Sequence, residues 1–159
     1  MKLKQLRKPI PNKISFRTIY YSKKQKLDEN KVIIDFSEEN LGQSRQIGES
    51  LLENDLIILL EHDPDILEYL NQAVPENKDK EFLPLVYVRK DGVKEEWIPD
   101  FSVIWQHRRP MIIEVKPLAV IMKNRKTLIN KWKQTEEIAK KNDWDFYVFT
   151  DILKSKSWI

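Results

Sequence analysis

Residues 97–117 read WIPDFSVIWQHRRPMIIEVKP, and this stretch decides the fold of the chain. Apolar residues alternate with other residues along 95–105, and a second apolar run at 111–116 follows a polar turn. Upstream, residues 83–89 have the composition of a strand, and the Asp-Gly pair at 91–92 is a strong hairpin signal. The three runs together predict a three-stranded antiparallel meander.

Helical patterns flank the predicted meander on both sides. Residues 44–61 contain no proline and carry leucines at helical spacing, and residues 124–142 show a second apolar stripe, in which Trp132 is interpreted as a core residue. A strand is predicted at 146–149, directly after the second helix, and a further short strand at 32–36. The order helix, three strands, helix, strand predicts an α/β fold in which helices flank a mixed sheet.

The composition is that of a folded protein without membrane spans. A chain of 159 residues can bury one sizeable core, so residues 1–159 are treated as a single domain. No apolar run approaches the roughly 20 residues that cross a bilayer, and no apolar segment follows the basic N-terminus as it would in a secretory signal. The absence of cysteine excludes disulfide frameworks and thiolate metal sites. A cytoplasmic location is expected.

The net charge of +3 conceals an uneven distribution along the chain. Residues 1–27 carry nine Lys or Arg and no acid, whereas residues 28–82 carry fifteen acids and four basic residues. Residues 123–159 are again basic, with nine Lys or Arg against five acids. We expect residues 1–40 to form a basic arm with an accessory strand, the basic ends to attract a polyanion, and the acidic middle to hold a divalent cation. A solvated charged surface is the plainer alternative.

Three charged residues interrupt the apolar strands of the predicted meander. Asp100 lies on the second strand, and Glu114 and Lys116 share one face of the third because they are two residues apart. Burying an unpaired ion is costly, so these charges need partners. Three explanations remain open: an ion pair between Lys116 and an acid, a carboxylate pair for acid/base chemistry, or a hard-metal site. In the third, Asp100, Glu114 and the carbonyl of Val115 would coordinate Mg²⁺ or Mn²⁺.

The pattern Pro99-Asp100, hairpin, Glu114-Val115-Lys116 resembles the PD-(D/E)xK nuclease superfamily. The resemblance implies a restriction-endonuclease-like core over residues 44–151, built from a helix, a three-stranded antiparallel meander, a helix and a strand. In this superfamily the acids hold Mg²⁺, for which Mn²⁺ commonly substitutes, and the lysine assists the attacking water.

Four segments, residues 49–72, 97–104, 113–117 and 147–151, carry a closer resemblance, which is to the TnsA family, the endonuclease subunits of heteromeric transposases. In that family the first helix supplies a third acid, and the matching position here is Glu53. Glu49, one helical turn earlier, is the alternative.

The TnsA resemblance implies a reaction and partners. The reaction would be Mg²⁺-dependent hydrolysis of a DNA phosphodiester, cutting one strand at a transposon end beside an integrase-like transposase and an AAA+ ATPase. The chain ends shortly after the core, so no C-terminal partner-binding domain is expected. The implied catalytic residues are Glu53, Asp100, Glu114 and Lys116, and all but the lysine are implied metal ligands. Because carboxylates repel DNA, binding is expected from basic residues on and before the second helix. These are Lys123, Arg125, Lys126, Lys131 and Lys133.

Two other functions are compatible with the same core. One is a stand-alone nuclease of the resolvase or defence type, against which the TnsA-like segment at 49–72 argues. The other is a non-catalytic DNA-binding assembly module. Such a module would have lost an acid or the lysine, whereas Asp100, Glu114 and Lys116 are all present.

Overall fold

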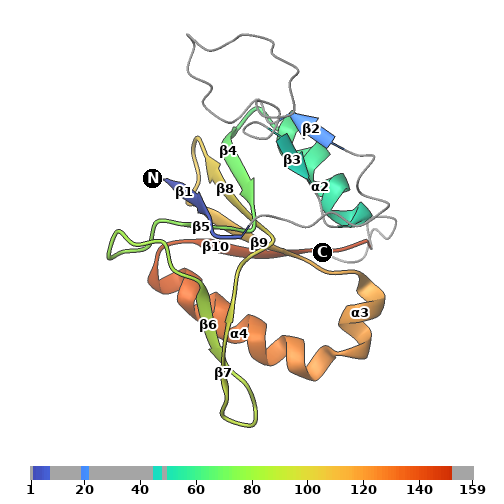
Figure 1. Cartoon of the computed structure of the whole chain (residues 1–159), viewed down its shortest axis with the longest axis vertical. Helices are drawn as coiled ribbons and strands as arrows, with labels where there is room; N and C mark the ends of the chain where they lie inside the picture. Colours follow the sequence, from blue (N-terminus) through green and yellow to red (C-terminus); the bar gives the residue numbers. More distant parts are fainter. Residues whose placement is uncertain (1, 8–18, 22–44, 48–49, 152–159) are drawn as a thin grey trace.

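A mixed sheet of four strands forms the centre of the structure, a computed structural model (Figure 1). The strand order is β10-β9-β8-β4; β4, β8 and β9 are antiparallel, and β10 is parallel to β9. The bounds are β4 Ile66–Asn71, β8 Phe101–Trp105, β9 Met111–Val115 and β10 Asp145–Phe149. The described residues are 2–7, 19–21, 45–47 and 50–151. The predicted α/β class with a mixed sheet between helices is confirmed.

The predicted arrangement of the meander is wrong in one respect. Its first two segments form a separate two-stranded hairpin, β6 (Leu85–Val88) and β7 (Lys94–Trp97), outside the central sheet. The predicted strand 95–105 is therefore two strands, interrupted at residues 98–100. Pro99 has no N–H to donate to a ladder, which favours a break at this point.

The third antiparallel strand of the central sheet is β4, which the sequence pattern does not predict. Its buried residues do not alternate regularly, because Ile66 and Tyr69 are three residues apart and both are buried. Leu67, although apolar, is exposed. A register shift between Ile66 and Glu68 against β8 accompanies this irregularity. The period-2 signal is therefore too weak to identify the strand from sequence.

Helix α2 (Leu51–His62) starts later than the predicted residue 44. Ser50 is its N-cap, and the Ser50 hydroxyl accepts a hydrogen bond of 3.2 Å from the N–H of Glu53. Before it, β3 (Arg45–Ile47) pairs with β2 (Ile19–Tyr21), so the predicted helix start is corrected to a strand. The predicted strand at 32–36 lies outside the described residues.

The second helical region matches its prediction closely. Helix α4 (Arg125–Lys141) follows the short helix α3 (Leu118–Lys123) and leads through a tight turn into β10. Lys140 and Lys141 lie in the last turn of α4, where positive charge interacts favourably with the helix dipole.

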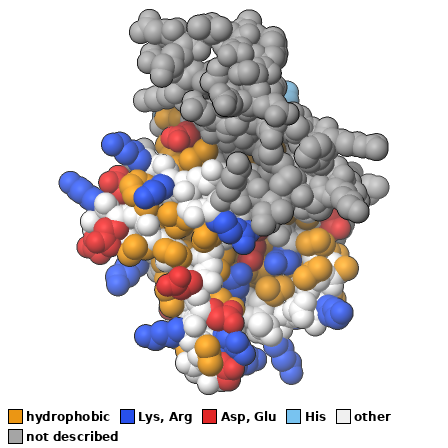
Figure 2. Space-filling model, in the orientation of Figure 1, with side chains coloured by type: hydrophobic (Ala, Val, Ile, Leu, Met, Phe, Trp, Pro, Cys, Tyr) orange, Lys and Arg blue, Asp and Glu red, His pale blue; other side chains and the backbone are white. Residues whose placement is uncertain are grey.

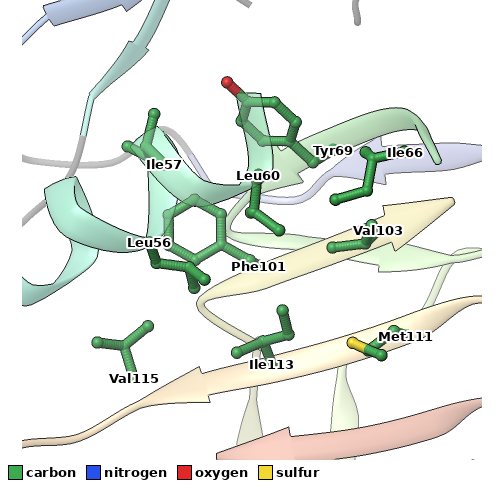
Figure 3. Packing of buried hydrophobic residues seen from close by; sticks show 10 residues of the cluster. All are labelled: Leu56, Ile57, Leu60, Ile66, Tyr69, Phe101, Val103, Met111, Ile113 and Val115. Atoms are coloured by element: carbon green, nitrogen blue, oxygen red, sulfur yellow. The ribbon is translucent and has the colours of Figure 1, made fainter. Parts of the chain in front are cut away.

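The two long helices cover opposite faces of the sheet (Figure 1). Figure 3 shows Leu56 and Leu60 of α2 packed onto Phe101, Val103 and Ile113 of the sheet. On the other face, buried Ile112 packs in a second cluster with Leu85, Ala139 and Trp144. Because side chains alternate along β9, Glu114 shares the α4 face with Ile112, while Ile113 and Val115 face α2.

A small second sheet attaches the first residues of the chain to the core. Strand β1 (Leu3–Gln5) pairs antiparallel with β5 (Ala73–Pro75), and the Ser102 hydroxyl of β8 donates a 2.6 Å hydrogen bond to the carbonyl of Ala73. The Gln5 side-chain amide donates to the backbone and side-chain oxygens of Asn71. This part of the predicted basic arm therefore lies against the core. Among the described residues, no helix has both the length and the apolar character needed to cross a membrane.

Replacing Phe101 by Ala is expected to destabilise the fold by about 3–5 kcal/mol, because its fully buried ring (0 % exposed) packs between α2 and the sheet. Urea unfolding followed by circular dichroism measures the change. The control is Leu59→Ala on α2, where the side chain is 53 % exposed and the loss of stability should stay within about 0.5 kcal/mol. Equal losses of stability in both variants would contradict the assigned core.

Candidate active site

A pocket of about 710 Å³ opens near the end of β9 and brings together residues from every layer of the fold. All four predicted catalytic residues line it: Glu53 of α2, Asp100 before β8, Glu114 of β9, and Lys116 just after β9. Further wall residues are Arg7, Gln72, Trp97 and Lys131. The sequence prediction that these acids and the lysine converge is consistent with this geometry.

Asp100 is held by the backbone on two sides. Its carboxylate Oδ2 accepts a 2.7 Å hydrogen bond from the N–H of Val115, and its carbonyl accepts one of 2.8 Å from the N–H of Gln72. Phe101 pairs with Ile113 across the β8–β9 ladder, and continuing this register by one residue sets Asp100 beside Glu114. Asp100, just before β8, and Glu114 of β9 therefore lie at the same end of the sheet.

Burial makes the Asp100 carboxylate expensive to ionise. Desolvation raises its pKa from 3.8 to about 6, against the lowering effect of the hydrogen bond from Val115. The negative charge of Glu114 raises the pKa further, and the ammonium groups of Lys116 and Lys131 oppose this. A nearby dication would relieve the cost by stabilising the ionised form.

Glu114 is buried, with 3 % of its surface exposed, and both carboxylate oxygens have partners. Its Oε1 accepts a 2.9 Å hydrogen bond from the Lys131 ammonium and lies 3.8 Å from that of Lys116. Its Oε2 accepts a short hydrogen bond from the Trp132 indole N–H. An ion pair between Lys116 and an acid, one of the three explanations that the sequence left open, is thus present at Glu114, but the closer cation comes from α4.

Glu53 approaches the pocket from the other side of the sheet. It is buried in the first turn of α2, the helix that covers the face opposite Glu114. The alternative acid, Glu49, lies outside the described residues. In residues 2–7, 19–21, 45–47 and 50–151, no three His, Asp or Glu side chains lie close enough together to hold a metal ion. The structure therefore places Glu53 in the pocket wall without gathering it into a ligand set.

The donor chemistry nevertheless fits a hard cation. Asp100 and Glu114 supply carboxylate oxygens from adjacent strands, which is the ligand type that Mg²⁺ prefers. From the described residues, Asp100 Oδ1 receives only a long contact of 3.4 Å, from the Gln72 side-chain amide. Glu114 could offer an oxygen to a metal ion only after that oxygen gives up its hydrogen bond to Lys131 or Trp132.

Two residues of α4 take part in the site in a way that the sequence does not predict. Lys131 is predicted on the DNA-binding surface and Trp132 in the core, yet both donate to Glu114. A signal was available for Lys131, because it lies three residues after Leu128 and four before Thr135, two buried residues of α4. A lysine in the core-facing stripe of a helix requires a buried partner.

Gln72 is a third residue that sequence reasoning missed. It is 1 % exposed, adopts a positive φ of 50°, and contacts Asp100 through both backbone and side chain. A left-handed backbone at a buried residue other than glycine is strained and often accompanies a functional site. No pattern in the sequence marked this position.

The remaining predicted DNA-binding residues are exposed on α3 and α4. Lys123, Arg125, Lys126 and Lys133 lie on the surface, whereas the Lys131 side chain is only 15 % exposed. On the face shown in Figure 2, Lys and Arg side chains are interspersed with Asp and Glu rather than joined in one patch. The basic segment 1–27 is described only at residues 2–7 and 19–21.

Comparison with known proteins identifies the family. No curated protein matches the chain. The family model described as "TnsA-like endonuclease N terminal" matches residues 63–151, a span that holds β4 to β10 and includes Asp100, Glu114 and Lys116 but not Glu53. This match covers more than half of the 159 residues. The chain therefore belongs to the TnsA-like endonuclease family of the PD-(D/E)xK nuclease superfamily, and this membership indicates a nuclease.

Proposed function

We propose that the protein is a metal-dependent endodeoxyribonuclease that hydrolyses a DNA phosphodiester bond. The observation that carries the proposal is the arrangement of Asp100 and Glu114 at one end of adjacent strands, in an open pocket that also contains Lys116. Two carboxylates in apolar strands are costly unless they bind a cation, and a phosphodiester backbone is the polyanion that the basic segments of the chain would attract.

Asp100 and Glu114 would hold the metal, which we propose to be Mg²⁺, with Mn²⁺ able to substitute. Glu53 and the carbonyl of Val115 are proposed as further ligands. When bound, such a metal polarises a phosphoryl oxygen and lowers the pKa of a bound water.

The chain itself supplies orientation and positive charge. The Val115 N–H fixes one oxygen of Asp100 and leaves the other turned toward Gln72. Lys116 is 28 % exposed at the pocket wall, where its ammonium can orient the attacking water or neutralise charge that develops on the phosphate. Exposed basic residues of α3 and α4 would bind the DNA backbone without reading its sequence.

Transposition is the proposed setting. The enzyme would cut one strand at a transposon end, together with an integrase-like transposase that cuts the other and an AAA+ ATPase that selects the site. Family membership supports this setting over a resolvase or defence nuclease.

Lys116→Met and Asp100→Asn are each expected to reduce Mg²⁺-dependent nicking of a supercoiled plasmid by on the order of 100-fold or more, because each removes a group that acts on the reacting phosphate or its metal. Nicking is measured by gel electrophoresis with purified protein. Binding of a DNA duplex should persist in both variants, and Lys78→Met, at an exposed loop residue, should nick normally. Wild-type nicking rates in both pocket variants would refute the assignment.

Asp100→Asn should also stabilise the protein above about pH 6 by on the order of 1–3 kcal/mol. The folded protein holds this carboxyl with a pKa of about 6 against an ordinary 3.8, so ionisation penalises the folded state as the pH rises between these values. The free-energy penalty of ionising Asp100 in the folded state is constant above about pH 6 and absent below pH 3.8. Thermal unfolding of the variant and the wild type at about pH 8 and about pH 3.5 measures the difference.

Asp79→Asn, at an exposed loop residue, is the matched control and should show no pH-dependent gain. A stability difference between Asp100→Asn and the wild type that is the same at both pH values would contradict the assigned cost of ionising this partly buried carboxyl.

Removing Lys123 and Lys126 together, as glutamines, should weaken binding to a short duplex and lower the slope of log K against log salt. The expected decrease in slope is roughly 0.9 for each phosphate that the lysines neutralise in the wild type. Fluorescence anisotropy at several salt concentrations measures it. The charge-matched control is Lys78→Gln with Lys80→Gln, two exposed residues between β5 and β6. Equal weakening of DNA binding in the two double variants would show that only net charge matters.

A further inference from the structure

Lys131 is set apart from the other lysines of α4 by its surroundings. Its side chain is only 15 % exposed, and its ammonium lies 2.9 Å from Glu114 Oε1. The same ammonium lies 4.1 Å from the centre of the Trp97 ring and 5.8 Å from that of Tyr87. A carboxylate and two aromatic faces all attract a cation, so the ammonium occupies a cation-binding position formed by β6, β7 and β9.

This position is beside the carboxylate that the proposed function assigns to a metal. Lys131 holds Oε1 of Glu114, and the Trp132 indole holds Oε2. Lys116 is farther away, at 3.8 Å, and is more exposed. A metal ion that binds Glu114 therefore competes with Lys131 more directly than with Lys116.

We propose that Lys131 is a resident counter-ion that neutralises Glu114 in the metal-free enzyme and that metal binding displaces it. This inference rests on the proposed function, because it assigns a role toward the same metal site. The charge on Glu114 is compensated in both states, by an ammonium before the exchange and by the dication after it. Lys131 thus weakens metal binding, and it prevents Glu114 from standing as an uncompensated buried charge while the metal is absent.

The displaced ammonium has a place to go. Lys131 and Trp97 both line the open pocket in which a DNA phosphate would lie. A four-carbon side chain can pivot about its stem, so the charge released from Glu114 stays at the pocket wall beside the phosphate.

The test is the affinity for Mn²⁺ and Mg²⁺, measured by isothermal titration calorimetry without DNA. Lys131→Met keeps an unbranched stem of nearly the same length and removes the charge, and it should bind metal roughly tenfold more tightly than the wild type, equivalent to about 1.4 kcal/mol. Lys131→Gln, which can still donate a hydrogen bond to Glu114, should also bind more tightly and serves if the methionine variant folds poorly. Lys131→Arg retains the charge and should bind no more tightly than the wild type.

Two control variants test whether the tighter metal binding of Lys131→Met arises at Glu114. Lys140→Met removes an exposed charge from the same helix and should leave metal affinity unchanged. Glu114→Gln should abolish the tighter binding when it is combined with Lys131→Met. The side-chain indole N–H resonance of Trp132 should shift when metal is added to the wild type, because its acceptor is Glu114.

The outcomes separate this inference from the function on which it rests. Tighter binding by Lys131→Met supports it, including the case in which only that variant binds measurably. Metal binding by the wild type with equal or weaker binding by Lys131→Met overturns it and makes Lys131 an anchor that positions Glu114. Absence of metal binding in every variant overturns the proposed metal dependence, and this inference with it.

Discussion

The buried charge of Glu114 is the constraint on which this end of the molecule depends. An acid with 3 % exposure in an apolar strand must find compensating partners, and here two lysines and an indole N–H provide them. Two of these partners are consecutive residues of α4, so the requirement fixes how that helix lies against β9. The same contacts of Lys131 and Trp132 with Glu114 therefore hold α4 against β9 and set the charge in the pocket.

Asp100 poses a related problem, which the fold solves differently. Among the described residues, its carboxylate accepts hydrogen bonds from the N–H of Val115 and, at 3.4 Å, from the Gln72 side-chain amide, and from no ammonium group. Burial still raises its pKa to about 6. The fold thus keeps one acid compensated by ammonium groups and the other poorly compensated, so Asp100 would gain from the dication that the proposed function requires.

The layered architecture explains why the third acid stands apart. Alternation along β9 sends Ile113 and Val115 toward α2 and Glu114 toward α4. Glu53 is carried by α2, so it reaches the pocket only where the sheet ends. In the described part of the chain, Asp100 and Glu114 lie at the same end of the sheet, and Glu53 lines the same pocket without joining them in a group of three acids.

The sequence by itself determined the local periodicities and the chemistry of single residues. Alternation identified β9, which carries Glu114, and the run that becomes β8 just after Asp100, and helical spacing identified α4 to within a residue or two at each end. The charges within these apolar runs marked Asp100, Glu114 and Lys116 as candidate site residues. Tertiary structure alone decided which strands pair and which partners the buried charges take. Residues 65–72 have too weak an alternation to reveal a strand, and β4 exists because pairing with β8 completes the sheet. Lys131 became a partner of Glu114 because docking of α4 made their ion pair less costly than leaving either charge buried alone, and such a balance depends on three-dimensional proximity that no local pattern encodes.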